Sequence, residues 1–241
     1  MSYRSSSHTR RRALTKAGAK PLKILFSAPI SLIVASITLV GCTTADPTIY
    51  SGLASASHLK ADPSDSSGRV PYRYNSGVNW RQYDKVIIDP VTIYRGQDNQ
   101  FVKVSEEDKT ALANYMQAQF TEKLRTRFSV VTAPEPGTLR VHLTLTGAKT
   151  TTPVLGPFSH VDVGGGVYNA VQAVRDKEGS MTGSVAYAVE IYDAATNTLL
   201  SAYVTKQYPN AMNVGASFGP LKASKVAIDK GADALMAQLR P

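Results

Sequence analysis

Cysteine is almost absent from this chain, which has 241 residues and only one cysteine, Cys42. A disulfide within the chain is therefore impossible, and the fold must depend on its apolar core. Long apolar runs are also absent after residue 41. A membrane-spanning helix needs about 20 such residues, so none is expected in that part.

Acidic residues are missing from the first 41 positions, which hold seven of the 27 basic residues. Residues 42–241 carry 20 basic and 18 acidic side chains, a net charge of +2 instead of the +9 of the whole chain. A nearly neutral part of this kind lacks the basic field that attracts nucleic acids and anionic membranes. We therefore predict no nucleic-acid partner.

The residues before Cys42 have the order of an export signal, in which basic residues precede the uncharged run 24–40. The order Leu-Val-Gly-Cys that ends this region closely resembles the lipobox of bacterial lipoproteins. A membrane-spanning helix is the alternative, but the run is short for a span and Pro29 interrupts it. We predict a signal peptide over residues 1–41, cleavage between Gly41 and Cys42, and lipidation of Cys42.

A lipid on Cys42 would be the link between this protein and a membrane. Thr43 follows the cysteine. By resemblance to the sorting of envelope lipoproteins, the lack of Asp at this position favours the cell outer membrane, with the protein facing the periplasm. The run Arg10-Arg11-Arg12 matches part of a twin-arginine signal, so the general secretory and twin-arginine routes both stay open.

The stretch after the cysteine is rich in Ser, Ala, Asp, Pro and Gly, most clearly over residues 61–68. Such a composition buries too little apolar surface to offset the entropy that ordering costs. We predict that residues 42–79 form a lipidated, flexible tether. The compact domain is expected over residues 80–241.

Two helices are expected in this domain. The first follows Ser105, a good N-cap with acidic residues behind it in the first turn. Its apolar side chains recur at four-residue steps and form one stripe, which comprises Leu112, Met116, Phe120, Leu124 and Phe128. The second helix is expected over residues 221–239 with a similar stripe.

Strands are expected where β-branched or alternating apolar residues occur, over residues 85–91 and 139–146 and in a hairpin of 184–192 with 199–208. The order of these elements predicts an α+β domain. We expect a mostly antiparallel sheet with two main helices packed on one face.

One catalytic motif can be considered. Residues 215–219 match Gly-x-Ser-x-Gly, the nucleophile elbow of α/β-hydrolases, and would make Ser217 the nucleophile. The elbow needs a strand before it and a histidine later in the chain, but Pro220 follows directly and no histidine comes after Ser217. We therefore predict that the protein is not an enzyme, and an envelope hydrolase using Ser217 is the alternative.

Other polar residues give weaker signals. His142 and His160 lack the spacing of a metal site, and His142 shares the polar parity of its strand. Glu190 and Asp193 could share acid–base work, but a turn-forming aspartate explains Asp193 equally well. We predict no metal and no cofactor.

Residues 150–180 interrupt the strand pattern with a glycine triplet at 164–166. A connection of this length is more often functional or disordered than structural. Within it, His160, Tyr168 and Arg175 supply side chains common in recognition. We predict a binding loop here, with a merely mobile loop as the alternative.

Several short segments together resemble a family of Gram-negative lipoproteins that share an uncharacterised domain, DUF3313. They are Ser51-Gly52-Leu53, the run 83–91, the helix after Ser105, Pro136-Gly137-Thr138-Leu139 and Glu190-Ile191-Tyr192-Asp193. The resemblance implies no catalytic residues. We expect a non-enzymatic accessory or binding module of the cell envelope, with an envelope protein as its partner and an oligomeric state that the sequence does not reveal.

Overall fold

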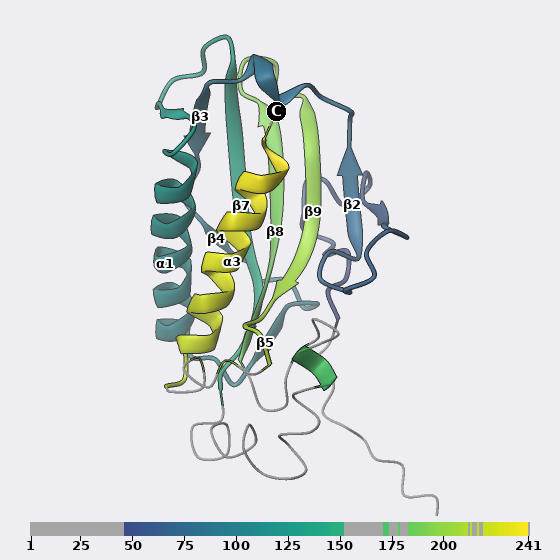
Figure 1. Ribbon diagram of the computed structural model, residues 1–241, viewed down its shortest axis with the longest axis vertical. Coiled ribbons are helices and arrows are strands. Elements are labelled where there is room, and N and C mark those ends of the chain that lie inside the picture. The colour runs from purple at the N-terminus through teal and green to yellow at the C-terminus, as the bar shows by residue number, and fades with distance from the viewer. Residues whose placement is uncertain are drawn as a thin grey trace, which may run out of the picture. The chain divides into compact units, whose positions relative to one another are not determined.

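The computed structural model describes residues 46–151, 171–173, 178, 183–211, 213, 216 and 219–240. Within them the chain forms a mixed α/β fold with one large, mostly antiparallel sheet (Figure 1). The predicted fold class is confirmed at this level. The described elements are β1 Lys60–Ala61, β2 Tyr72–Asn75, the 3₁₀ helix η1 Trp80–Gln82, β3 Lys85–Ile88, β4 Thr92–Ile93, β5 Gln100–Val102, α1 Glu106–Leu124, β6 Ser129–Val130, β7 Thr138–Lys149, β8 Ser184–Asp193, β9 Leu199–Gln207 and α3 Lys222–Gln238.

The sheet has the strand order β1-β2-β9-β8-β7-β3-β6, and β4 and β5 also pair with β7. Strands β1, β2, β9, β8 and β7 pair antiparallel in succession, whereas β3, β4 and β5 run parallel to β7. Parallel pairing needs a long crossover connection, and α1 lies between these strands and β7 in the chain. Strand β7 is therefore the centre of the sheet, with antiparallel pairing on one side and parallel pairing on the other.

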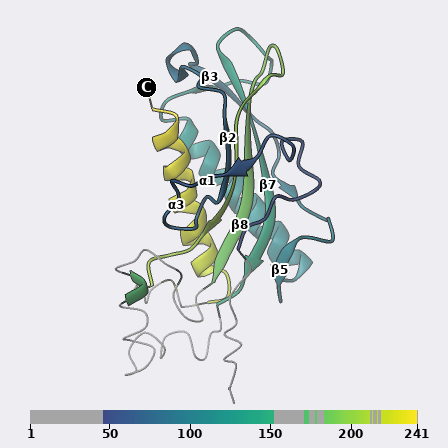
Figure 2. The ribbon, with the colours of Figure 1, turned by 90° about the vertical axis from the view of Figure 1, so that its right-hand side faces the viewer.

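Helices α1 and α3 lie side by side on one face of the sheet, as Figure 1 and Figure 2 both show. The stripe predicted for α1 is buried here, and the Phe120 ring meets the Tyr187 ring of β8 edge-on at 5.8 Å. Helix α3 can approach the same tyrosine because residue 231 is glycine: a Cβ there would lie 1.9 Å from Tyr187 Oη. The helix-side core therefore combines an apolar stripe with one close backbone approach.

The first helix begins as its sequence predicts. The Ser105 hydroxyl accepts a hydrogen bond from the Asp108 backbone N–H at 3.0 Å, which satisfies one donor of the first turn. Strand β7 alternates as predicted too, with Leu139, Val141 and Leu143 buried on the helix side. Local sequence rules therefore describe this side of the molecule well.

The opposite face of the sheet has a core of its own. Tyr50, Leu53 and Leu59 are buried there against the small side chains of Ala188 and Ala202. Burial raises the pKa of the Tyr50 hydroxyl to about 12. We call residues 46–61, which supply this cover, the N-terminal cover.

The prediction of a flexible tether over residues 42–79 is wrong for its described part, 46–79. The N-terminal cover ends in β1, which pairs with β2, and β2 extends the sheet by pairing with β9. The reason is that the sheet offers an apolar surface on which large side chains of this segment are buried, and distant side chains accept its backbone hydrogen bonds. The folded domain therefore begins well before residue 80.

Candidate functional site

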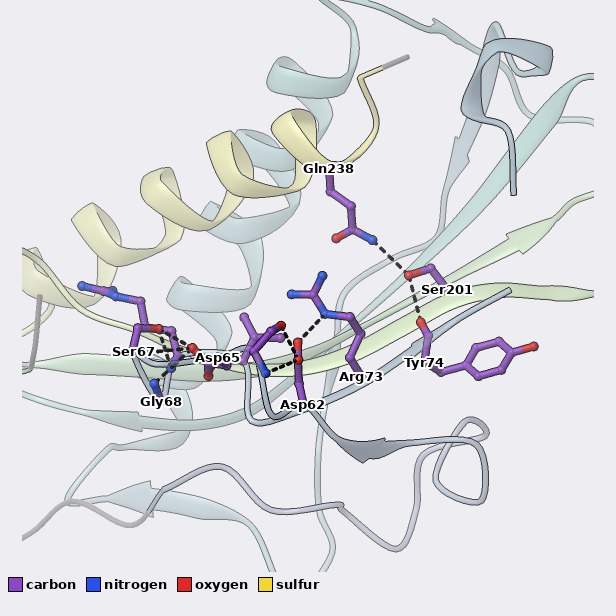
Figure 3. A network of polar contacts seen from close by, with 11 residues as sticks. Asp62, Asp65, Ser67, Gly68, Arg73, Tyr74, Ser201 and Gln238 are labelled. Carbon is purple, nitrogen blue, oxygen red and sulfur yellow. Dashed lines mark hydrogen bonds and ion pairs between the residues drawn. The ribbon is translucent and has the colours of Figure 1, made fainter. Parts of the chain in front are cut away.

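A polar groove runs between α3 and the segment 62–73. Its volume is about 420 Å³, and we call it the α3 groove. The groove is lined by Asp62, Ser64, Asp65, Ser67, Arg69, Val70, Arg73, Gln207, Lys230 and Ala234. It is a concave surface with both signs of charge, and Figure 3 shows part of its network of contacts.

The two carboxylates of the groove are held by the turns in which they lie. Asp65 Oδ1 accepts hydrogen bonds from the Ser67 backbone N–H and hydroxyl at 3.0 and 2.6 Å, and Oδ2 accepts from the Val70 N–H at 2.7 Å. Burial raises the pKa of Asp65, but these hydrogen bonds outweigh burial and hold the pKa below its ordinary value. Asp65 is therefore an ionised acceptor at neutral pH, not a proton donor.

The Asp62 carboxylate is held by its turn in the same way. Its Oδ1 accepts from the Ser64 hydroxyl and backbone N–H, and its Oδ2 lies 3.2 Å from Arg73 Nε. Figure 3 shows the Arg73 guanidinium beside this carboxylate. The Ser64 hydrogen bonds, followed by Arg73, keep the pKa of Asp62 below its ordinary value. The turn thus presents Arg73 in a defined position.

Three cations complete the groove, and they differ in accessibility. Arg69 is only 8% exposed; its guanidinium stacks 3.8 Å from the Tyr208 ring centroid and donates to Gln207 Oε1 at 3.1 Å. Lys230 Nζ lies 3.5 Å from the Tyr208 carbonyl oxygen. Arg73 has a side chain that is 40% exposed. Arg73 is therefore more accessible to a ligand than Arg69.

The walls of the groove are tied together. The Gln238 amide of α3 donates to the Ser201 hydroxyl of β9 at 3.0 Å, and this hydroxyl donates in turn to the Tyr74 carbonyl of β2 at 3.2 Å (Figure 3). Helix α3 and strands β9 and β2 are thus linked by one chain of hydrogen bonds. This fixed surface is lined by three cations and two ionised carboxylates.

A second set of ionisable residues lies where β3 meets β7. His142 Nε2 is 2.7 Å from Asp89 Oδ2, and Arg140 Nε is 3.6 Å from the same oxygen. The Tyr192 ring packs 5.1 Å from the imidazole. Burial, followed by the nearby charge of Glu190, raises the pKa of Tyr192 to about 12. Asp89 directly follows β3, and its carboxylate contacts two basic side chains of β7, Arg140 and His142. This set of residues therefore joins the two strands.

The two carboxylates considered for acid–base work, Glu190 and Asp193, make different contacts. Glu190 is 5% exposed and accepts a hydrogen bond from the Ser55 backbone N–H at 2.6 Å. Asp193 accepts from the Ala195 and Thr196 N–H groups at 3.0 and 2.9 Å, which confirms its interpretation as a turn former. Glu190 instead fastens the N-terminal cover to the sheet.

Most residues singled out in the sequence lie outside the described residues. This holds for the predicted cleavage and lipidation site, for the nucleophile candidate and for the predicted binding loop: Gly41, Cys42, Ser217, His160, Tyr168 and Arg175. Among the described residues, no group of three His, Cys, Asp or Glu could hold a metal ion. No helix in the described ranges is long and apolar enough to cross a bilayer.

The α3 groove was missed because seven of its ten lining residues fall in the predicted tether. One signal was present. Asp62 and Asp65 are each followed two residues later by a serine, Ser64 and Ser67, and this Asp-x-Ser spacing is typical of turns closed by the aspartate side chain. Two such turns in succession indicate an ordered segment.

Two of the solved structures that match resemble this chain only loosely. A PelC dodecamer from Paraburkholderia phytofirmans is 8% identical, with 68% of this chain and 94% of that chain covered and a TM-score of 0.35. The hypothetical protein CT253 from Chlamydia trachomatis is 10% identical, with 65% and 98% covered and a TM-score of 0.33. These scores are too low to carry a fold or a function over to this chain.

A comparison with curated proteins finds no match. A family match, in contrast, covers most of the chain, from residue 49 to residue 235. It begins inside the N-terminal cover, in agreement with the early start of the folded domain. The chain belongs to the family described as "Protein of unknown function (DUF3313)".

Proposed function

We propose that this protein is an outer-membrane lipoprotein, anchored through Cys42, whose domain is a non-enzymatic binding module for another protein of the cell envelope. The observation that carries the binding role is the α3 groove, a concave surface with fixed charges. The proposal of a lipid anchor rests on the sequence of the leader and lipobox.

The groove favours an acidic partner segment. Its two carboxylates have their oxygens engaged by backbone and serine donors, so their charges are partly satisfied within the turn. Arg73 combines a position beside Asp62 with a side chain that is 40% exposed, and an arginine fork binds carboxylates with two parallel hydrogen bonds. Side chains that are already ordered lose little entropy on binding. A short acidic stretch of an envelope protein fits these properties.

The anchor is tested by mass spectrometry of the mature protein. We expect a mass that corresponds to cleavage after Gly41 and a lipid on Cys42, and we expect the Cys42→Ala variant to remain as precursor or to appear as unanchored protein. A mature wild-type protein with an unmodified Cys42 thiol would overturn this part of the proposal.

The binding role is tested by photo-crosslinking in cells. A photoreactive residue at Ala234, which is exposed and lines the groove, should capture a discrete partner. The same residue at Ala118, exposed on α1, is the control for random encounters. In the Ala234 background, Arg73→Glu should abolish the crosslink and Arg81→Glu, an equal charge change at an exposed arginine elsewhere, should preserve it.

The variants also show which part of the proposal fails. Equal crosslinks at Ala234 and Ala118, or a crosslink that survives Arg73→Glu in a folded variant, would remove the groove as the binding site. Circular dichroism of each purified variant shows whether the fold is retained. Purified captured partner should then bind wild-type protein more weakly as salt is raised, because salt screens an interaction between exposed charges.

A further inference from the structure

The N-terminal cover is fastened to one end of the sheet from its first described residue. Gln100, on β5, donates through Nε2 to the Asp46 carbonyl oxygen at 2.8 Å and accepts at Oε1 from the Tyr50 hydroxyl at 3.0 Å. The Ser51 N–H donates to Asp98 Oδ2 at 3.0 Å nearby. The chain therefore has a fixed starting point beside β5.

Asp46 is only four positions after Cys42 in the chain. A fully extended chain spans about 3.5 Å per residue, so Cys42 can lie at most about 14 Å from Asp46. If Cys42 carries lipid, the end of the sheet that contains β5 must therefore stay close to the bilayer. The flexible tether predicted over 42–79 would have allowed a much larger separation.

This end of the sheet also exposes apolar side chains. Val102, the last residue of β5, is 47% exposed and is followed by the exposed Lys103. Among the described residues the other exposed large hydrophobics are Val171 and Val130, at 44% and 38%. Figure 1 and Figure 2 place the helical residues 171–173 at the same end as β5. Val102, the most exposed of the three valines, therefore lies at the end where the chain enters.

A hollow of about 210 Å³ adds apolar surface beside Val102. It lies in a row across four strands in which Gln100 faces Gly147, Gly147 faces Ala186 and Ala186 faces Lys206. The two middle positions of this row are Gly147 and Ala186. Because glycine has no side chain and alanine has only a methyl group, the surface is recessed there. Lys206 Nζ is paired with Glu178 Oε2 at 2.7 Å.

We propose that this end of the sheet rests on the phospholipid surface that holds the anchor, with Val102 at the boundary of the acyl chains and Lys103 among the phosphates. This inference depends on the proposed lipid on Cys42. The short reach from Asp46, the exposed valine and the adjacent cation all point to the same end of the molecule. An apolar side chain next to a lysine suits the membrane interface, where the lysine keeps its charge in the headgroup layer.

The exposed valine on β6 provides a matched control. Val130 faces Val86, which in turn faces Leu139 on β7, whereas Val102 faces Lys149 on the same strand. Ten residues of strand separate Leu139 from Lys149, about 33 Å at the usual rise. The two valines are thus similar in exposure and far apart along the sheet.

The test uses the full mature lipoprotein in vesicles of phosphatidylethanolamine and phosphatidylglycerol that contain a nitroxide-labelled lipid. Because Cys42 is the only cysteine and is acylated, Val102→Cys and Val130→Cys each accept one thiol-reactive fluorophore. We expect the probe at residue 102 to be quenched severalfold more strongly than the probe at residue 130. Equal quenching in anchored protein would overturn the inference.

Failure of the anchor can be told from failure of the orientation. If mass spectrometry shows an unmodified Cys42 and the protein does not sediment with the vesicles, the proposed lipoprotein is wrong and this inference falls with it. If the protein is acylated and sediments but the two probes are quenched alike, only the orientation is wrong. Melting temperatures equal to wild type show that both labelled variants are folded, as expected for exposed valines.

Discussion

The two faces of the sheet are covered in different ways. One face lies under α1 and α3, whose apolar side chains recur with the period of a helix. The other face lies partly under the N-terminal cover, an irregular segment that contributes Tyr50, Leu53 and Leu59. The comparison shows that a protein core need not have a periodic cover, provided that the sheet beneath it presents small apolar side chains.

The difference also concerns polar groups. A helix satisfies its own backbone donors, whereas an irregular segment needs partners elsewhere. The N-terminal cover finds them in side chains of distant residues: the Ser55 N–H donates to Glu190 and the Gly52 N–H donates to the Tyr94 hydroxyl at 3.1 Å. The second face therefore depends on a few long-range hydrogen bonds as well as on apolar burial.

The largest effect is expected on the helix side. Phe120→Ala should lower the free energy of unfolding by about 4 kcal/mol, since it removes a fully buried ring and its edge-on contact with Tyr187. Denaturation in urea, followed by circular dichroism, measures this loss. A change within experimental error would mean that the α1 stripe is not the centre of the core.

A smaller but clear loss is expected under the N-terminal cover. Leu53→Ala should cost about 2 kcal/mol, because the leucine is buried against the sheet but keeps 7% of its surface exposed. Val102→Ala, at an exposed valine, is the control and should change stability by less than about 0.5 kcal/mol. If Leu53→Ala were as neutral as the control, residues 46–61 would behave as a tether after all.

Two substitutions separate the stability contributed by the hydrogen bond that Glu190 accepts from the stability contributed by burial of the N-terminal cover. Glu190→Ala leaves the Ser55 N–H without its acceptor and should cost about 1–2 kcal/mol. Glu190→Gln keeps an oxygen at this position and should cost less. Thermal unfolding of both variants checks the order, and an equal loss would show that the acceptor oxygen is not what matters.

The smallest effect is a pH dependence at the α3 groove. The folded pKa of Asp65 lies below the ordinary value of 3.8, so its stabilisation is present above that pH and is lost as pH falls through the folded pKa. The melting temperature of Asp65→Asn should therefore fall less than that of wild type on acidification below this value. Ser67→Ala, which removes a donor to the carboxylate, should lie between them. If the melting temperatures of all three proteins fell equally with pH, the lowered pKa of Asp65 would be contradicted.

Much of the helix side could be predicted because its signals are local. Ser105 caps α1, and the four-residue spacing from Leu112 to Leu124 marks the buried stripe. The alternation in β7 identifies its buried side within one strand. Each of these patterns depends only on residues that are close in sequence.

The N-terminal cover and the α3 groove could not be predicted because their partners are distant. Ser55 and Glu190 are 135 positions apart, and Arg69 and Gln207, which form part of the groove, are 138 positions apart. Composition made residues 43–79 resemble a tether, since its apolar residues are few and follow no period. Whether such residues fold depends on what surface the rest of the chain offers.

The sequence by itself therefore determined the class of the fold, the start of α1, the inward side of β7 and the impossibility of a disulfide. Only the tertiary structure decided that β2 extends the sheet at β9, that Tyr50 and Leu53 are buried, and that Arg73 meets Asp62 beside α3. The physical reason is that local periodicity records which side of an element is apolar. It does not record the distant surface against which that side, or an irregular segment, will pack.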